Sequence, residues 1–278
     1  MLSSVLMAPH GAEIIPLAGQ PYNDAFRPLH AAMEQAGQAL AERDTDLLMM
    51  VTPHGYSLDA AYTIYLHERF QGLFYNLTES NVFGEISGRA LWTGERDQAA
   101  AVLAGLRQRG VAADGLVHGS PGYPLALAWG ETVPLHYLVR GAAPKVVLIG
   151  LPRARHDRLA QMQQDLATLG RVLRDVADRY DGAVSIVSSA DLSHTHTSQS
   201  PYGYHASSAA FDATVQAWAA APTRDKLERM LALQPTALAC GMAGMCILQA
   251  IFDERPLVCR QLTYAAPTYF GMAVALWA

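Results

Sequence analysis

The chain has 278 residues, of which 51% are hydrophobic and only 16% are charged, and its formal net charge at pH 7 is -5. This composition excludes intrinsic disorder, because disordered chains are rich in charge and poor in apolar residues. An acidic balance without a cluster of lysine and arginine argues against a surface that binds nucleic acid.

Short apolar runs alternate with helical patterns along the chain. Strands are predicted at residues 5–8, 47–51, 60–73, 134–139, 145–149, 183–187, 258–264 and 270–277. Helices are predicted from the capping residues Asn23 and Asp24 to about residue 43, and then at residues 98–109, 156–180, 206–219, 224–233 and 241–252. This alternation predicts an α/β fold: a single compact domain over residues 1–278, with a central, largely parallel or mixed sheet flanked by helices.

One stretch, residues 230–252, contains no charged residue and is long enough to span a membrane. Gln234, Pro235 and Gln249 interrupt it, however, and a charged helical segment at residues 224–229 precedes it. We therefore interpret this stretch as a helix that breaks at Pro235, followed by a second buried helix. No association with a membrane is expected.

The cysteines Cys240, Cys246 and Cys259 are odd in number and lie within the last forty residues. They give no disulfide framework, and the N-terminus lacks the basic region that precedes the apolar run of a signal peptide. A reducing compartment, the cytoplasm, is therefore the expected location.

The same tripeptide ends two of the predicted buried strands, as Pro9-His10-Gly11 and Pro53-His54-Gly55. The composition gives roughly 0.04 such tripeptides by chance. Ligands of open α/β sheets lie beyond the carboxyl ends of the strands, where a proline stops pairing and a glycine permits a close approach. On neighbouring parallel strands the two imidazoles would converge on one point. This pattern favours metal ligation over histidines that only cap loops by hydrogen bonding.

A third polar cluster follows the predicted strand at residues 183–187, in the run Ser188-Ser189-Ala190-Asp191-Leu192-Ser193-His194-Thr195-His196. An imidazole that titrates near neutrality suits general acid/base work. His194 and His196 would point to opposite sides of an extended segment, so we expect one of them to face the site. The alternative interpretation is a solvated polar loop.

Together with Cys240-Gly241 ahead of a buried helix, these motifs resemble the class III (LigB-type) extradiol ring-cleavage dioxygenase superfamily, which includes the Memo-like proteins. The resemblance covers most of the chain, from His10 to the segment at residues 264–267. It implies that His10 and His54 are metal ligands and that His194 is the catalytic acid/base histidine.

The chemistry that this resemblance implies needs a divalent metal, most simply Fe(II). Two histidines and one carboxylate on one face of Fe(II) leave positions open for a chelating substrate and for O₂. The substrate would be a small aromatic diol or aminophenol, cleaved next to the diol. The reaction type rests on the resemblance. A homo-oligomer is also expected.

The third ligand departs from the dioxygenase pattern, in which a Glu precedes the glycine. Cys240 holds that position here, as in the Memo-like branch. A thiolate is a softer ligand, which would favour Zn or Cu, and a buried cysteine can also simply fill a core. Glu13 and Glu131 are the remaining carboxylate candidates.

A second departure concerns the Asp-His-Gly motif of the superfamily, which reads Ala128-Trp129-Gly130 in this chain. Trp129 therefore replaces an active-site histidine, and we expect Trp129 and His196 to contact the substrate. Three functional hypotheses stay open: a ring-cleaving dioxygenase, a Memo-like metal-binding or interaction protein without ring cleavage, and a zinc hydrolase that uses His10, His54 and a carboxylate to activate water. A purely structural role for these residues, with no metal at all, is the fourth alternative.

Overall fold

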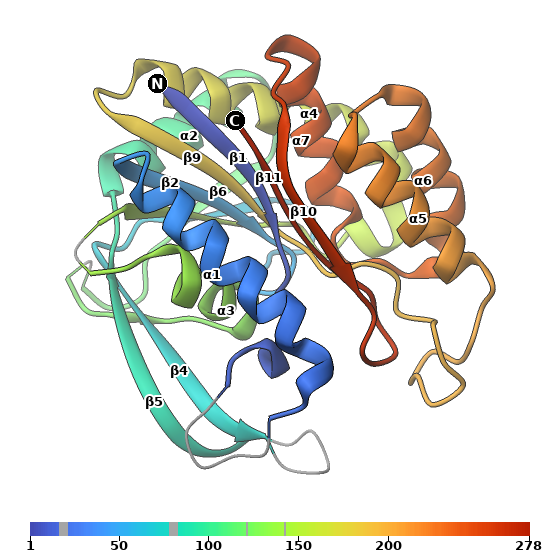
Figure 1. Cartoon of the computed structure of the whole chain (residues 1–278). Coiled ribbons are helices and arrows are strands. Elements are labelled where there is room, and N and C mark those ends of the chain that lie inside the picture. Colours follow the sequence, from blue (N-terminus) through green and yellow to red (C-terminus); the bar gives the residue numbers. More distant parts are fainter. Residues whose placement is uncertain (17–21, 78–82, 121, 142) are drawn as a thin grey trace.

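The fold is built on an eight-stranded mixed sheet, seen in the computed structural model of the chain (Figure 1). The structure describes residues 1–16, 22–77, 83–120, 122–141 and 143–278. The strand order is β10-β11-β1-β9-β2-β8-β3-β6, and a smaller sheet has the order β5-β4-β7. The strands are β1 (Leu2–Ala8), β2 (Thr45–Thr52), β3 (Tyr62–Tyr65), β4 (Arg69–Leu77), β5 (Phe83–Thr93), β6 (Ala113–Leu116), β7 (Leu125–Ala126), β8 (Lys145–Gly150), β9 (Ala183–Ser189), β10 (Cys259–Ala265) and β11 (Met272–Trp277).

The four central strands β1, β9, β2 and β8 are parallel, and antiparallel strands join them on both sides. The register places Leu6 and Met50 on either side of Val187 in β9. The predicted strands at residues 5–8, 47–51, 145–149 and 183–187 are confirmed, as is the α/β fold with a mixed sheet. The carboxyl ends of all four parallel strands lie at one edge of this sheet.

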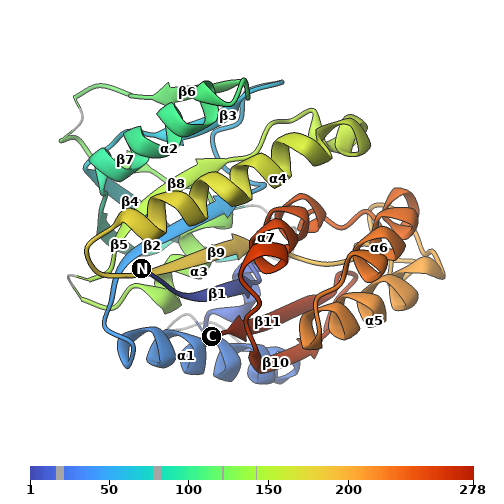
Figure 2. The same ribbon diagram turned by 90° about the horizontal axis from the view of Figure 1, so that it is seen from above.

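Helices cover both faces of the sheet (Figure 2). They are α1 (Arg27–Ala41), α2 (Arg96–Gln108), α3 (Trp129–Leu138), α4 (Arg155–Arg179), α5 (Ser207–Ala220), α6 (Arg224–Ala237) and α7 (Met242–Glu254), with short 3-10 turns at Ala12–Ile14 and Asp24–Phe26. Strand β2 shows why two layers are needed: Met49 packs in the core under α4 and α7, whereas Leu48 and Met50 pack in the core under α1 and α3. Such a strand is apolar on both faces.

The uncharged stretch at residues 230–252 spans the end of α6 and most of α7. Helix α6 continues past Pro235 to Ala237 and ends at Leu238, which has a left-handed φ of 55°. The side chain of Gln234 bonds both the N–H and the carbonyl of Ala239, which closes this end. Among the described residues, no helix combines the length and apolar character that crossing a membrane requires.

Two sequence predictions for the middle of the chain are wrong. Residues 134–139, predicted as a strand, form the second half of α3 and its C-cap, because a short, mostly buried apolar run carries no period to tell helix from strand. Residues 60–73, predicted as one strand, are divided between β3 in the large sheet and β4 in the small one. Strand β4 pairs with β5 in a long antiparallel hairpin (Figure 1).

Candidate metal centre

The histidines of the two Pro-His-Gly motifs follow β1 and β2, as predicted, but these strands are not neighbours. Strand β9 pairs with both of them and lies between them. Two strand spacings separate the backbones by roughly 10 Å, so the side chains must lean toward each other over the end of β9. The ring centroids of His10 and His54 are 4.9 Å apart, at an interplanar angle of 83°.

Cys240 completes a group of three donor residues with these histidines. One ligand atom from each of His10, His54 and Cys240 lies within 4.8 Å of the other two, and the Cys240 Sγ is 3.4 Å from the His10 Nε2. Cys240 lies in the turn between α6 and α7, which packs closely on the end of β9. A Cβ on Gly241 would lie 2.5 Å from the Ala190 Cβ, so the residue after Cys240 must be glycine.

Hydrogen bonds fix the tautomer of His10. Its Nδ1 is 2.8 Å from the Ser189 Oγ, and that hydroxyl donates its only hydrogen to the Gly130 carbonyl, 2.6 Å away. This carbonyl is available because Pro134, four residues on in α3, has no N–H to donate to it. Ser189 must therefore accept from His10 Nδ1–H, which leaves a lone pair on Nε2 facing Cys240.

Burial keeps both histidines in the form that binds metals. Desolvation, followed by the nearby charge of His194, lowers the pKa of His10 to about 3. Desolvation and then the charge of His10 lower the pKa of His54 to about 2. Burial raises the pKa of the Cys240 thiol, so the thiolate forms only where a cation takes the place of the proton.

Asp191 places a carboxylate beside His10. Its Oδ1 accepts the backbone N–H of His10 at 3.0 Å, and its Oδ2 lies 3.2 Å from the His10 Nε2. Burial raises the pKa of Asp191 to about 6, so it is largely ionised at neutral pH. A carboxylate oxygen and a nitrogen lone pair at this distance repel unless a proton or a cation lies between them. The donors His10, His54 and Cys240 thus fit a divalent metal, with the Asp191 carboxylate next to His10.

The structure does not bring the two glutamates that were candidate ligands, Glu13 and Glu131, into this group. Glu131 is fully buried, where its Oε1 accepts from the Tyr65 hydroxyl at 2.8 Å and its Oε2 from the Ala128 N–H at 3.1 Å. A Cβ on Gly55 would lie 2.0 Å from Glu131 Oε1, so the glycine after His54 is required for a close approach. Glu131 therefore packs against the turn that carries His54 and stabilises it.

The protonation of Glu131 gives a pH-dependent prediction. Burial raises its pKa from 4.5 to about 8, so between these values the folded protein holds a proton that the unfolded chain has lost. This group therefore lowers the free energy of unfolding as the pH rises from 4.5 to 8, by up to about 1.4 kcal/mol per pH unit. Glu131→Gln removes that slope. Urea unfolding from pH 4.5 to 8 should show the free energy of unfolding of the variant rising relative to that of wild type as the pH increases. Parallel pH profiles of the two free energies would contradict the assignment.

His194 lies beside the cluster, and its Nε2 has no hydrogen-bond partner among the described residues. Its Nδ1 is 2.8 Å from the Leu192 carbonyl, which can only accept, so Nδ1 carries the hydrogen and Nε2 has the lone pair. The ring stacks on Phe270 at a centroid distance of 5.4 Å. His194 lines a pocket of about 190 Å³ together with His54 and Cys240. The geometry thus gives this pocket a base beside three candidate metal ligands.

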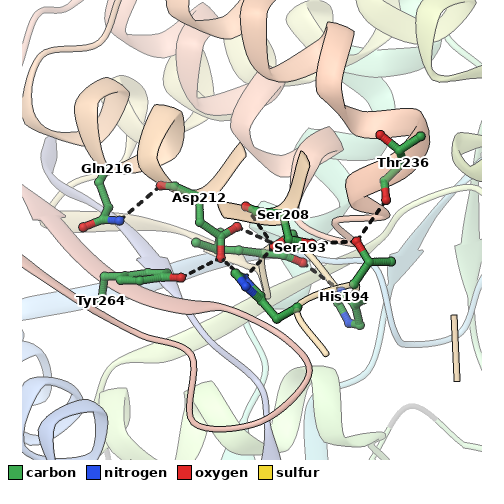
Figure 3. Close-up of polar contacts among 10 residues, drawn as sticks. Ser193, His194, Ser208, Asp212, Gln216, Thr236 and Tyr264 are labelled. Atoms are coloured by element: carbon green, nitrogen blue, oxygen red, sulfur yellow. Dashed lines mark hydrogen bonds and ion pairs between the residues drawn. The ribbon is translucent and has the colours of Figure 1, made fainter. Parts of the chain in front are cut away.

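His196 points away from this pocket, in line with the expected alternation. Its Nε2 lies 2.7 Å from the Asp212 Oδ2 and 2.9 Å from the Ser193 Oγ. The buried Asp212 carboxylate also accepts from the Tyr264 hydroxyl and the Ser193 N–H (Figure 3). His196 is not among the residues that line the pocket. Its surroundings make it part of a buried network that holds the loop carrying His194.

Trp129 begins α3 and stacks on His54, with centroids 5.2 Å apart and planes at 30°. It also lines a second pocket of about 280 Å³, whose other walls are mainly apolar and include Ile15, Leu127 and Val133. The residue that replaces the family histidine therefore braces one candidate ligand and lines this second pocket, not the pocket that His194 lines.

Comparison with protein-family models identifies the family of this chain. Residues 4–276 match the model described as the catalytic LigB subunit of aromatic ring-opening dioxygenase. No curated protein matches the chain. Because the family match covers nearly the whole sequence, the resemblance drawn from the Pro-His-Gly motifs is confirmed. The chain belongs to the LigB family of aromatic ring-opening dioxygenase catalytic subunits.

Proposed function

We propose that the protein is a metal-dependent dioxygenase that opens the ring of a small aromatic diol or aminophenol with O₂. The observation that carries the proposal is the group His10, His54 and Cys240, two of whose members, His54 and Cys240, line the same pocket as His194. When bound there, Fe(II) would supply the path for electrons from the diol to O₂.

The chain's own residues would contribute proton transfer, orientation and shielding. The His194 Nε2 is the free base that would take a proton from the first hydroxyl of the substrate, since its Nδ1–H is held by the Leu192 carbonyl. Stacking of Trp129 on His54 fixes the ligand ring. The pocket of about 190 Å³ corresponds to roughly six water volumes, which is enough for one substituted ring.

The test is anaerobic loading with Fe(II), followed by addition of air-saturated buffer and a panel of catechols and aminophenols. The proposal expects uptake of one O₂ per diol and the absorbance of a ring-opened product. Full metal occupancy without O₂ uptake on any member of the panel would reject it. Release of a hydrolysis product without O₂ consumption would instead support the zinc hydrolase.

A second candidate is a Memo-like metal-binding protein without ring cleavage, and Cys240 is the observation that favours it. Its Sγ lies 3.4 Å from the His10 Nε2, in the place that a glutamate holds in the dioxygenases of the superfamily. A sulfur ligand in place of a carboxylate favours Zn or Cu over Fe(II) as the bound metal. Preferential retention of Zn or Cu by the wild-type protein, lost in Cys240→Ser and without any O₂ uptake, would support this candidate.

A further inference from the structure

Two large, mainly apolar side chains that line the pocket beside the candidate metal centre are exposed. Tyr202 is 60% exposed and Leu238 is 40% exposed. Both line the pocket of about 190 Å³ that His194 and Cys240 also line. Single exposed apolar side chains are ordinary on a protein surface, so exposure alone assigns them no role. What distinguishes these two is the backbone that carries each of them.

The turn that carries Tyr202 is tied to the backbone of the candidate base. The Ser200 Oγ donates to the His194 carbonyl at 2.6 Å and accepts the Tyr202 N–H at 3.0 Å. A backbone hydrogen bond from Gly203 to Ser200 closes the turn, with Pro201 inside it and Gly203 at a left-handed φ of 74°. The rings of Tyr202 and His194 meet edge to face, with centroids 6.1 Å apart. Ser200 thus fixes Tyr202 relative to His194.

Leu238 has a backbone conformation that leucine avoids. It follows the end of α6 with φ 55° and ψ 41°, the left-handed place that glycine or asparagine normally takes after a helix. A side chain with a Cβ crowds the following carbonyl oxygen there, which costs stability. A side chain that is 40% exposed recovers little of that cost by burial. Strained residues of this kind cluster at ligand-binding sites.

The polar side chains of the pocket account for only one end of an aromatic diol. The candidate metal ligands and His194 face the oxygens and the acidic proton, whereas the carbon framework of a ring needs apolar contacts. Among the described residues, Tyr202 and Leu238 are the large apolar side chains that both line this pocket and are exposed. A ring that rests on them would bury apolar surface, and an aromatic pair with Tyr202 adds further attraction.

We propose that Tyr202 and Leu238 together bind the planar ring of the ligand and so select an aromatic chelator over an aliphatic one. The inference rests on the proposed function, because it places the ring of that diol. It also links ring binding to the base, since the turn of Tyr202 is held by the His194 carbonyl through Ser200. A ring in contact with Tyr202 therefore lies at a set place relative to His194.

The test measures binding of catechol and of acetohydroxamate to Zn-loaded protein by calorimetry. Both chelate a metal through two neighbouring oxygen atoms, but only catechol has a ring. Tyr202→Ala should weaken catechol binding roughly tenfold and change acetohydroxamate binding less than about twofold, because only ring contacts are lost. Tyr202→Phe keeps the ring and should bind both as wild type does. Tyr204→Ala is the matched control, since Tyr204 is 65% exposed and is not among the residues that line the pocket.

Leu238→Gly separates ring binding from a purely structural role. Glycine takes the left-handed conformation without strain, so the free energy of unfolding of this variant should not fall below that of wild type. Catechol should nevertheless bind roughly threefold more weakly, because part of its apolar contact is lost. A less stable variant with wild-type affinity for catechol would show that Leu238 serves the fold alone, which would overturn its part in the inference.

The inference as a whole is overturned if Tyr202→Ala binds catechol as wild type does, or if wild type binds no catechol. It is also overturned if Tyr202→Ala loses both chelators alike, since the defect would then lie in the metal centre, or if Tyr204→Ala shows the same loss. Because binding is measured on the zinc protein without turnover, ring selectivity in a protein that cleaves no diol would reject the proposed function and retain the inference.

Discussion

Replacing His10 and His54 together by alanine should abolish stoichiometric metal binding. The two imidazoles are neutral at pH 7 because burial lowers the pKa of His10 to about 3 and that of His54 to about 2, so both offer lone pairs. Loss of a residue that only hydrogen-bonds to a metal ligand typically costs 10–100-fold in metal affinity. Loss of two ligands should therefore exceed roughly a thousandfold, leaving Cys240 and Asp191 too few to hold the ion.

Metal content after gel filtration and competition with a chelator measure this effect. His205→Ala is the matched control, because His205 is an exposed histidine outside the pocket. Ser189→Ala should give a smaller effect, because it removes only the hydrogen-bond acceptor of His10 Nδ1–H. We expect it to lower metal affinity 10–100-fold. Unchanged metal content in the double variant would show that the group of His10, His54 and Cys240 is not the site.

His194→Gln should lower kcat by roughly 10²- to 10⁴-fold while leaving bound metal unchanged, the range typical for loss of a general base. The hydrogen bond from Nδ1 to the Leu192 carbonyl fixes the tautomer and makes Nε2 the accepting atom. A glutamine can keep a hydrogen bond to that carbonyl, but it cannot accept a proton at neutral pH. Initial rates of O₂ uptake, measured with metal content on the same samples, separate the two effects.

The pH dependence distinguishes a base from a positioning residue at His194. If His194 takes the proton, its variant should also lose the acidic limb of the kcat profile, whereas a purely structural defect lowers kcat at every pH alike. His205→Gln serves again as the control, since it removes an exposed imidazole of the same kind. A His194→Gln enzyme with wild-type kcat would exclude the proposed base.

The parts of the site that sequence predicts are those attached to strand ends. His10, His54 and His194 each follow an apolar run, and the carboxyl ends of parallel strands meet at one edge of the sheet whatever the rest of the chain does. The order of the strands in the sheet could not be predicted from the sequence. Strand β9 enters between β1 and β2 from more than 130 residues further along the chain, and no local pattern encodes that pairing.

The remaining donors depend on packing between distant segments. Cys240 reaches His10 only because the α6–α7 turn packs on Ala190 at the end of β9, a contact across 230 residues of chain. Asp191 was part of a polar run, but its closeness to His10 follows from the β1–β9 register.

The central claim is that His10, His54 and Cys240 hold one metal ion. X-ray absorption on Zn-loaded protein tests it most directly, because sulfur and nitrogen ligands differ in distance, about 2.3 Å against 2.0–2.1 Å. We predict one ion per chain with a single sulfur and two imidazoles, and loss of the sulfur shell in Cys240→Ser. One ion per chain without any sulfur neighbour, or a spectrum unchanged in Cys240→Ser, would contradict it.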